Sequence, residues 1–271
     1  MKILRIIPVL TIMALYCGNA IAGLVVTAQS IRNDGSEVAE KIFIDQDKIK
    51  IEWPDFTATF DLKAQTLVLA DPAALTFYLG TLSEYTTGVK EFKLDLLKKS
   101  IIGMPEDQAA ESLKIFSNQI EHYFDIPDNP AGSIQIIKHG FDGKVSGYKT
   151  DKYEISLNGS VKEEIWISPV LKAGDGINWS NFLKFLITTG IMDKDLAYMS
   201  SPEYIGLLKT GFPLRIIRVS DGTQAEFQVS DLEEKPIPGY EFSTPALSKK
   251  LNIAGWLGQK IDKENDYDDY E

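Results

Sequence analysis

The chain has 271 residues, a formal net charge of −11 and one cysteine. The excess of acidic side chains repels phosphate backbones, so the composition excludes non-specific nucleic-acid binding. A single cysteine cannot form an intrachain disulfide, so a chain of this length must be held together by the burial of apolar side chains.

The N-terminus has the three parts of a secretory signal peptide. Lys2 and Arg5 give a positive start, an apolar stretch follows at 6–16, and the sequence Ala-Ile-Ala at 20–22 supplies small residues at the cleavage position. The apolar stretch is much shorter than the roughly 20 residues that span a bilayer. We therefore expect a cleaved signal peptide over residues 1–22, a periplasmic location and no transmembrane segment in the mature chain.

Cys17 offers a second interpretation, in which the chain carries a lipoprotein signal and this cysteine is lipidated. Such a signal needs a small residue just before the cysteine, whereas Tyr16 is large. Secretion and lipid anchoring are therefore less favoured than a free periplasmic protein. Cleavage after Ala22 removes the only thiol, which excludes a thiolate nucleophile and a cysteine-ligated metal.

Apolar and polar residues alternate in short runs between Leu24 and Leu82, which is typical of strands with one buried face. The apolar positions of these runs are Ile42, Ile44, Ile49, Ile51, Trp53, Phe56, Ala58, Phe60, Leu62, Leu67, Leu69, Leu75, Phe77 and Leu79. Turn-forming sequences separate the runs at 33–35, 45–47, 53–55 and 71–72. This region therefore predicts an antiparallel meander of about four to six strands.

Helical spacing replaces the alternation between Ser83 and Phe124. Apolar residues fall at helical intervals up to about Ile102, and the sequence Gly-Met-Pro at 103–105 interrupts the pattern. A second helix is expected to start near Pro105, because proline suits the first turn and the acidic residues that follow it suit the helix dipole.

Strand patterning returns between Ile134 and Ser168. Asp142-Gly143 and Asn158-Gly159 are sequences that favour tight hairpin turns, so each is expected to join two antiparallel strands. Helical spacing resumes at 179–192 and at 202–209.

Two last strands are expected at 214–219 and 224–232, joined at Asp221-Gly222. The end of the chain, 262–271, is acidic and poor in aliphatic residues, which predicts a disordered tail.

Strands and helices do not alternate strictly, so the order of elements favours an α+β fold over a parallel α/β fold. We expect one large curved antiparallel sheet, an unclosed half-barrel, with helices packed on its concave side. The predicted domain covers residues 23–261, with helical insertions near 83–124 and 179–209.

No catalytic motif is recognisable, and no cofactor is expected. His122 and His139 lack the neighbouring ligands of a metal site and the serine or acidic partners of a triad. Glu163 and Glu164 are adjacent on a predicted strand, so their side chains point to opposite faces and cannot act together on one glycosidic bond. The sequence predicts a protein that is not an enzyme.

Aromatic residues are the remaining candidates for a binding site. They pack in an ordinary core, or they line an apolar cavity between a curved sheet and a helical lid, where a lipid tail would gain from burial. The candidate ligand-binding residues are Trp53, Phe56, Phe60, Phe77, Tyr153, Trp166, Trp179, Phe182 and Phe185.

The second half of the chain resembles uncharacterised exported proteins with a LolA/LolB-like fold, the fold of outer-membrane lipoprotein carriers. The segments that carry this resemblance are Tyr148-Lys149-Thr150, Tyr153-Glu154-Ile155, Asn158-Gly159, residues 165–168, 211–215, 229–235, Ile237-Pro238, and Phe242 with Pro245. In the first half, residues 47–52 and Phe60-Asp61 resemble the early hairpin of the same families. The resemblance implies an unclosed, curved antiparallel sheet wrapped over helices, with an apolar interior and no catalytic residues.

The sequence leaves three hypotheses for function. The first is a periplasmic, non-enzymatic binding protein that shelters an apolar ligand, such as a lipid acyl chain or a lipoprotein. The second is a structural or protein-interaction module of the cell envelope, with a filled core, no ligand and an envelope protein as partner. The third is a hydrolase whose site residues form no known motif.

Overall fold

The computed structural model describes residues 23–259, except 32–34, 123, 126–131, 172–175, 221–222 and 247. The predicted signal peptide, the predicted acidic tail and the turn residues Asp221-Gly222 therefore lie outside the described residues.

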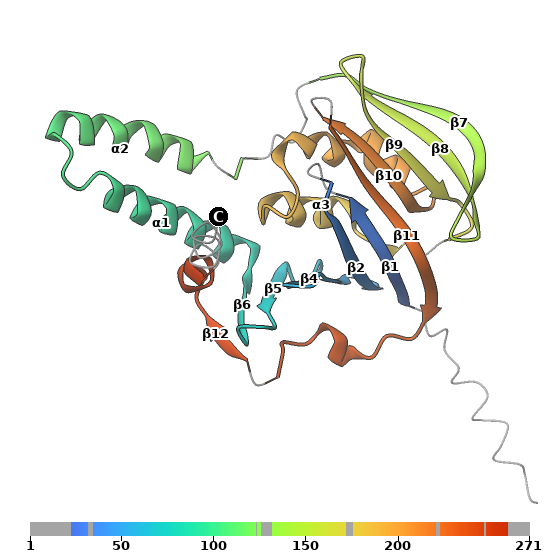
Figure 1. The fold of residues 1–271 in the computed structure, drawn as a ribbon, viewed down its shortest axis with the longest axis horizontal. Helices are drawn as coiled ribbons and strands as arrows, with labels where there is room; N and C mark the ends of the chain where they lie inside the picture. Colours follow the sequence, from blue (N-terminus) through green and yellow to red (C-terminus); the bar gives the residue numbers. More distant parts are fainter. Residues whose placement is uncertain are drawn as a thin grey trace, which may run out of the picture.

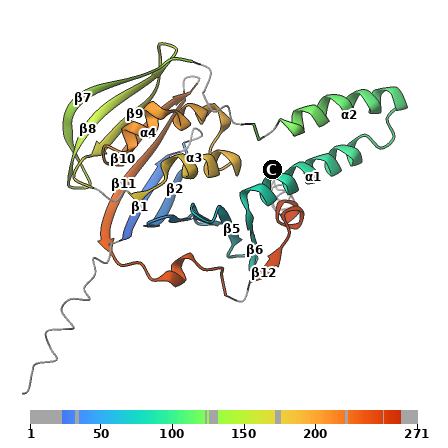
Figure 2. The ribbon, with the colours of Figure 1, turned by 180° about the vertical axis from the view of Figure 1, so that it is seen from behind.

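The described residues form one 12-stranded sheet in the order β12-β6-β5-β4-β3-β2-β1-β11-β10-β9-β8-β7. Its two edges do not pair with each other, and Figures 1 and 2 show the sheet curving around a group of helices. Neighbouring strands are antiparallel, apart from the parallel pair β12 and β6. The structure thus confirms the expected large, unclosed, mostly antiparallel sheet.

The first six strands form the predicted antiparallel meander. They are β1 (Gly23–Ile31), β2 (Glu37–Asp45), β3 (Lys48–Glu52), β4 (Thr57–Asp61), β5 (Thr66–Asp71) and β6 (Thr76–Thr81). Burial alternates as the sequence indicates in β3, where Ile49 and Ile51 are buried between more exposed neighbours. In β6 the predicted face is wrong, because Thr76 and Tyr78 are buried and Leu75, Phe77 and Leu79 are not. The register pairs Ile49 with Ile44 and Phe60, which places apolar side chains in rows on the concave face.

The second half of the sheet is built from β7 (Ile134–Val145), β8 (Tyr148–Leu157), β9 (Ser160–Ser168), β10 (Phe212–Ser220) and β11 (Thr223–Lys235). Strand β11 pairs with β10 on one side and with β1 on the other. It is therefore the strand that joins the two halves of the sheet.

The predicted turn at Asp142-Gly143 is wrong. These residues lie inside β7, where the register with β8 shifts between Phe141 and Lys144. The hairpin turns instead at Ser146-Gly147, whose φ angles of 49° and 83° are both positive. Two-residue hairpins of type I′ require positive φ at both positions, and Ser146-Gly147 meets this requirement. Asp142-Gly143 forms a bulge within β7 instead.

Asn158-Gly159 forms a hairpin turn as predicted, with φ angles of 52° and 78°. It joins β8 to β9, and the strands pair from Leu157 with Ser160 onward.

Helices α3 (Trp179–Thr188) and α4 (Pro202–Leu208), with the 3-10 helix η4 (Lys194–Ser200) between them, lie on the concave side of the sheet (Figures 1 and 2). Most of α3 is buried, because its apolar residues cover more than one face of the helix. The sequence predicts α3 and α4, but not η4.

Helices α1 (Leu82–Ser100) and α2 (Glu106–Glu121) form a hairpin that projects from the body (Figures 1 and 2). Helix α1 starts at a capping box, in which Thr81 and Glu84 bond each other's backbone amides. Its first half is anchored by Tyr85 and Val89, whereas no residue of α2, all of which the structure describes, is buried. Beyond its first half, the α1–α2 hairpin therefore does not pack on the concave side of the sheet, which α3, η4 and α4 cover.

The C-terminal segment contains elements that the sequence analysis does not predict. After the 3-10 helix η5 (Gly239–Phe242), the strand β12 (Lys249–Leu251) pairs with Thr76–Tyr78 of β6. A short helix at 253–259 follows and buries Ile253 and Trp256. The segment thus runs from β11, in the middle of the sheet, to the edge of the sheet beside β6 (Figure 1).

The core lies between the concave face and α3. Phe60 of β4 is fully buried, and its ring centroid lies 5.5 Å from that of Phe185 and 5.8 Å from that of Phe182, both on α3. Burying a side chain of this size stabilises the fold by roughly 1.5–3 kcal/mol. These contacts fix α3 against one half of the concave face.

Candidate functional site

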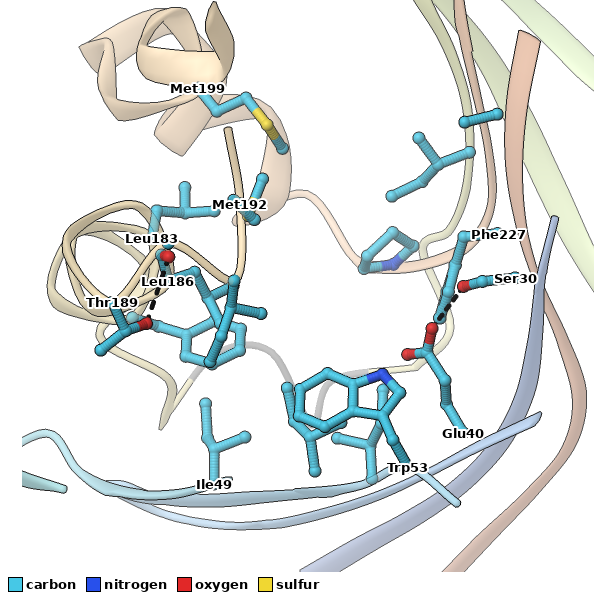
Figure 3. Close-up of a pocket in the computed structure, with 18 of the residues that line it drawn as sticks. Ser30, Glu40, Ile49, Trp53, Leu183, Leu186, Thr189, Met192, Met199 and Phe227 are labelled. Atoms are coloured by element: carbon cyan, nitrogen blue, oxygen red, sulfur yellow. Dashed lines mark hydrogen bonds between the residues drawn. The ribbon is translucent and has the colours of Figure 1, made fainter. Parts of the chain in front are cut away.

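A half-open cavity of about 870 Å³ lies beside this core, between α3 and η4 on one side and the concave face on the other. Figure 3 shows Leu183, Leu186, Met192 and Met199 pointing into it from the helical side, opposite Ile49 and Trp53 from the sheet. Most of the lining is apolar.

Two sequence periodicities build the lining. Residues 179, 182, 183 and 186 of α3 follow helical spacing, so one stripe of the helix faces the cavity. On the sheet, Ile42 and Ile44 of β2 and Ile49 and Ile51 of β3 alternate with residues of the other face. The cavity wall is therefore part of the same apolar surface that forms the core.

Few polar groups line the cavity. Ser30 Oγ donates a hydrogen bond to the Glu40 carboxylate, as Figure 3 shows, and Thr189 Oγ1 donates to the Phe185 carbonyl at 2.8 Å. The indole N–H of Trp179 is buried and makes no hydrogen bond within the described part of the chain. The other polar side chains of the lining are Asp55, Tyr85, Glu226, Tyr204 and Arg218, and the last two bond to a buried carboxylate, that of Glu163.

We call Glu163, Arg218, Tyr198 and Tyr204 the Glu163 cluster. Glu163 of β9 is fully buried on the concave face. Its carboxylate accepts hydrogen bonds from the Tyr204 hydroxyl, from the Tyr198 hydroxyl at 3.2 Å and from Arg218 Nε at 3.2 Å. Because three donors converge on it, the carboxylate is buried without being left unpaired.

The protonation states in the Glu163 cluster follow from burial and from the carboxylate. Burial raises the pKa of the Tyr198 and Tyr204 hydroxyls, and the nearby Glu163 charge raises it further, so both remain neutral donors. Burial lowers the pKa of Arg218, but the attraction of Glu163, the contributions of Tyr204 and Tyr198 and the hydrogen bond to Glu163 together raise it by more, so the net shift is upward. Arg218 therefore stays charged.

Four of the nine predicted binding residues line the cavity, namely Trp53, Phe56, Trp179 and Phe182. The rings of Trp53 and Phe56 stack at 4.8 Å between centroids. The structure thus brings together two aromatic residues from the meander and two from α3.

The other five do not line it. Phe60, Phe185 and Tyr153 are buried in the core, and Phe77 lies on the face of β6 opposite to the core residue Tyr78.

Trp166 lies on the outer face of the sheet. Its ring lies between the Lys152 ammonium, 4.9 Å from the centroid, and the Arg215 guanidinium, at 4.8 Å, and its indole N–H donates to Asp142 at 2.9 Å. These contacts are those of a cation–π stack that covers the sheet.

Sequence reasoning missed the aliphatic lining and Arg218. Isoleucine, leucine and methionine residues such as Ile49, Leu183 and Met199 carry no signal that separates a cavity wall from a core. Arg218 belongs to a predicted strand, and the alternation places it on the face of Leu214, the concave side. The place of Arg218 in this alternation was the only feature of the sequence that indicated its position on the concave side.

No helix in the described part of the chain is both long and apolar enough to cross a bilayer. Among the described residues, no three His, Cys, Asp or Glu side chains lie close enough together to hold a metal ion.

No protein-family model matches the sequence, and no curated protein matches it significantly. Among solved structures, the chain is similar to an uncharacterised conserved protein from Thermus thermophilus, with a TM-score of 0.43, 9% identity, and coverage of 89% of this chain and 97% of that one. It is also similar to PNGF-II, with a TM-score of 0.37, 11% identity, and coverage of 88% and 32%. MucB follows with a TM-score of 0.35, 12% identity, and coverage of 88% and 62%.

These solved structures include MucB but identify no family for the chain. Because their TM-scores lie below 0.5, the description of the fold rests on the strand order and register given above.

Proposed function

We propose that this chain is a non-enzymatic binding protein that shelters an apolar ligand, such as a lipid acyl chain, in the cavity between α3 and the sheet. The observation that carries the proposal is a half-open cavity of about 870 Å³ with a largely apolar lining. Ligand sites in proteins have volumes of roughly 300–1,000 Å³ and similar linings.

The energetics favour a long, flexible apolar ligand. Each methylene group moved from water into the cavity contributes about 0.8 kcal/mol, so ten of them contribute roughly 8 kcal/mol before the entropic cost of binding. Methionines at two positions of the wall, Met192 and Met199, are adaptable enough to follow the shape of an alkyl chain.

We place this binding protein in the periplasm, where a free lipid or the acyl chains of a lipoprotein are its candidate ligands. The support for this location is the signal-like sequence at residues 1–22.

The proposal of a non-enzymatic role rests on the Glu163 cluster, the most polar part of the site. Its two tyrosines have raised pKa values, so they act as hydrogen-bond donors and are poor nucleophiles. Its carboxylate is occupied by three donors. Such a cluster holds charge in place and is not arranged for proton transfer.

A protein-interaction module is the second candidate, and the α1–α2 hairpin favours it. Large apolar side chains are exposed along this hairpin, at Leu96, Ile102, Met104, Ile115 and Phe116. The same hypothesis predicts a filled interior, and the cavity speaks against that part of it.

Organic extraction of the purified full-length chain, followed by mass spectrometry, tests the proposed function. A co-purifying lipid or fatty acid is the expected result. An extract without lipid, together with no heat on titration of hexadecanoate or hexadecanol in a calorimeter, would favour the interaction module.

A pair of variants on β10 tests where the ligand binds. Ile216 lines the cavity, so Ile216→Trp fills part of it and is expected to weaken hexadecanoate binding by at least about tenfold. Val219 is exposed and does not line the cavity, so Val219→Trp serves as the matched control with unchanged affinity. Equal affinities for both variants would place the ligand elsewhere.

A further inference from the structure

Arg218 is the only basic residue among the described residues that line the cavity. The other charged residues of the lining are Glu40, Asp55 and Glu226. Glu40 accepts a hydrogen bond from Ser30, and Glu226 is paired with Arg215 at 2.7 Å. The cavity is therefore apolar with several acidic groups and one cationic group.

The guanidinium of Arg218 is only partly used by the protein. Arginine has five N–H donors, and Nε of Arg218 is bonded to Glu163 at 3.2 Å. Its two terminal amino groups make no hydrogen bond with the part of the chain that the structure describes. The side chain is 29% exposed, whereas its partner Glu163 is completely covered. Arg218 thus bonds the carboxylate through Nε, and the same residue lines the cavity.

The stability of the fold does not by itself explain why Glu163 and Arg218 form an ion pair at this position. Replacing a buried ion pair by apolar residues of similar volume is often neutral or stabilising, because both charges must be removed from water. Three donors fix the position of the Glu163 carboxylate, which in turn holds Arg218 at the wall. A fixed guanidinium with free terminal donors is the group that binds carboxylates and phosphates in a bidentate manner.

We propose that Arg218 binds the anionic head group, a carboxylate or a phosphate monoester, of a single-chain lipid whose alkyl chain occupies the apolar part of the cavity. This inference rests on the proposed function and names the class of ligand.

The distribution of charge gives such a ligand a direction. Arg218 is on β10 and Glu40 is on β2, and the strands β11 and β1 lie between them. Three inter-strand spacings, roughly 14 Å, separate the two strands. The register places Glu40 level with Val229 of β11, four residues from Ala225, the partner of Arg218. An anionic head group is attracted to the Arg218 side and repelled from the Glu40 side, so the tail runs from Arg218 along the isoleucine rows toward α3.

Calorimetric titration of the full-length chain with four lipids of equal chain length tests the head group without any substitution. The ligands are hexadecanoate, hexadecyl phosphate, hexadecanol and hexadecyltrimethylammonium, at mildly alkaline pH and submicellar concentration. We expect at least one of the two anions to bind at least about tenfold more tightly than the alcohol, and the cation to bind more weakly than the alcohol. The comparison between the carboxylate and the phosphate identifies the preferred anion.

Two variants locate the effect at Arg218. Removing Arg218 alone leaves a buried carboxylate without its cation, so the test uses Glu163→Gln with Arg218→Gln. The matched control is Glu164→Gln with Lys152→Gln, an ion pair at 2.8 Å that does not line the cavity. The Glu163 and Arg218 double variant is expected to lose the preference for anions over hexadecanol. The control double variant keeps that preference, because Glu163 and Arg218 are unchanged.

The outcomes separate the two proposals. If the wild type binds the anions and the alcohol with equal affinity, the assignment of the head group to Arg218 is wrong, whereas the proposal that the cavity binds an apolar ligand is still supported. A preference for anions that survives in the Glu163 and Arg218 double variant also overturns that assignment. Binding of none of the four lipids by the wild type overturns the proposed function and this inference with it.

Discussion

The hydroxyl of Tyr204 is expected to contribute measurably to stability, because it donates to a carboxylate that has no access to water. Tyr204→Phe removes one of three donors to Glu163 and should lower the free energy of unfolding by about 1–3 kcal/mol. Tyr240→Phe is the control, since Tyr240 is 71% exposed. Urea unfolding of both variants checks this, and equal midpoints would show that Tyr204 is dispensable to the Glu163 cluster.

Alkaline pH is expected to destabilise the fold through its buried tyrosines. Burial, with a smaller effect of Glu84, raises the pKa of Tyr78 from 10.0 to about 12. The folded state therefore favours the protonated hydroxyl, and this contribution to stability is complete below pH 10 and is lost as the pH rises from 10 to about 12. Tyr198 and Tyr204 shift in the same direction.

Urea unfolding at a series of alkaline pH values, with tyrosinate absorbance recorded in parallel, measures this loss. Tyr78→Phe should reduce the dependence of stability on pH in that range. Ionisation of every tyrosine before any unfolding would contradict the prediction.

At single positions, the sequence could predict that a residue is buried but not what it is buried against. Trp53, Phe60 and Trp166 all belong to alternating runs, yet they line the cavity, fill the core and cover the outer face, respectively. The register between strands that are distant in sequence decides among these environments. Arg218 was missed because its partner Glu163 is 55 residues away, and neither residue has a local motif.

At the scale of elements, the core helix α3 and the projecting hairpin are expected to respond very differently to the loss of an aromatic ring. Phe60→Ala removes the ring that packs on α3 and should cost about 3–5 kcal/mol of unfolding free energy. Phe116→Ala on α2 should cost less than about 0.5 kcal/mol, because that side chain is 47% exposed.

Chemical denaturation of the two phenylalanine variants, monitored by circular dichroism, provides the comparison. A large loss for Phe116→Ala would mean that the α1–α2 hairpin packs more tightly than its exposure indicates.

Most strands and helices could be predicted because they bury one face, and burial of one face imposes a period on the sequence. The elements that were missed have no such period. Strand β12 has three residues and depends on backbone pairing with β6, and η4 is a 3-10 helix of seven residues between α3 and α4. The turn at Ser146-Gly147 was missed because Asp142-Gly143 has the stronger local preference, and the pairing of β7 with β8 overrides it.

For the whole molecule, the C-terminal segment is expected to protect one edge of the sheet. A chain that ends at Lys235 lacks β12 and the helix at 253–259, so β6 becomes an unpaired edge. Exposed edges promote association between chains, and the truncated protein should self-associate and melt at a lower temperature.

Light scattering and thermal unfolding check this result. The matched control is a chain that ends at Gln259, which retains both elements. A monomeric truncated protein with an unchanged melting temperature would show that β12 and the helix at 253–259 are not needed to protect the edge strand β6.

The position of β11 has a consequence for the order of events during synthesis. Val26 of β1 pairs with Leu232 of β11, so the ribosome has made almost the entire chain before these partners can meet. Long-range pairings of this kind form late and slowly. The meander and the second group of strands can therefore form separately, and they become one continuous sheet only when β11, the penultimate strand, pairs with both β1 and β10.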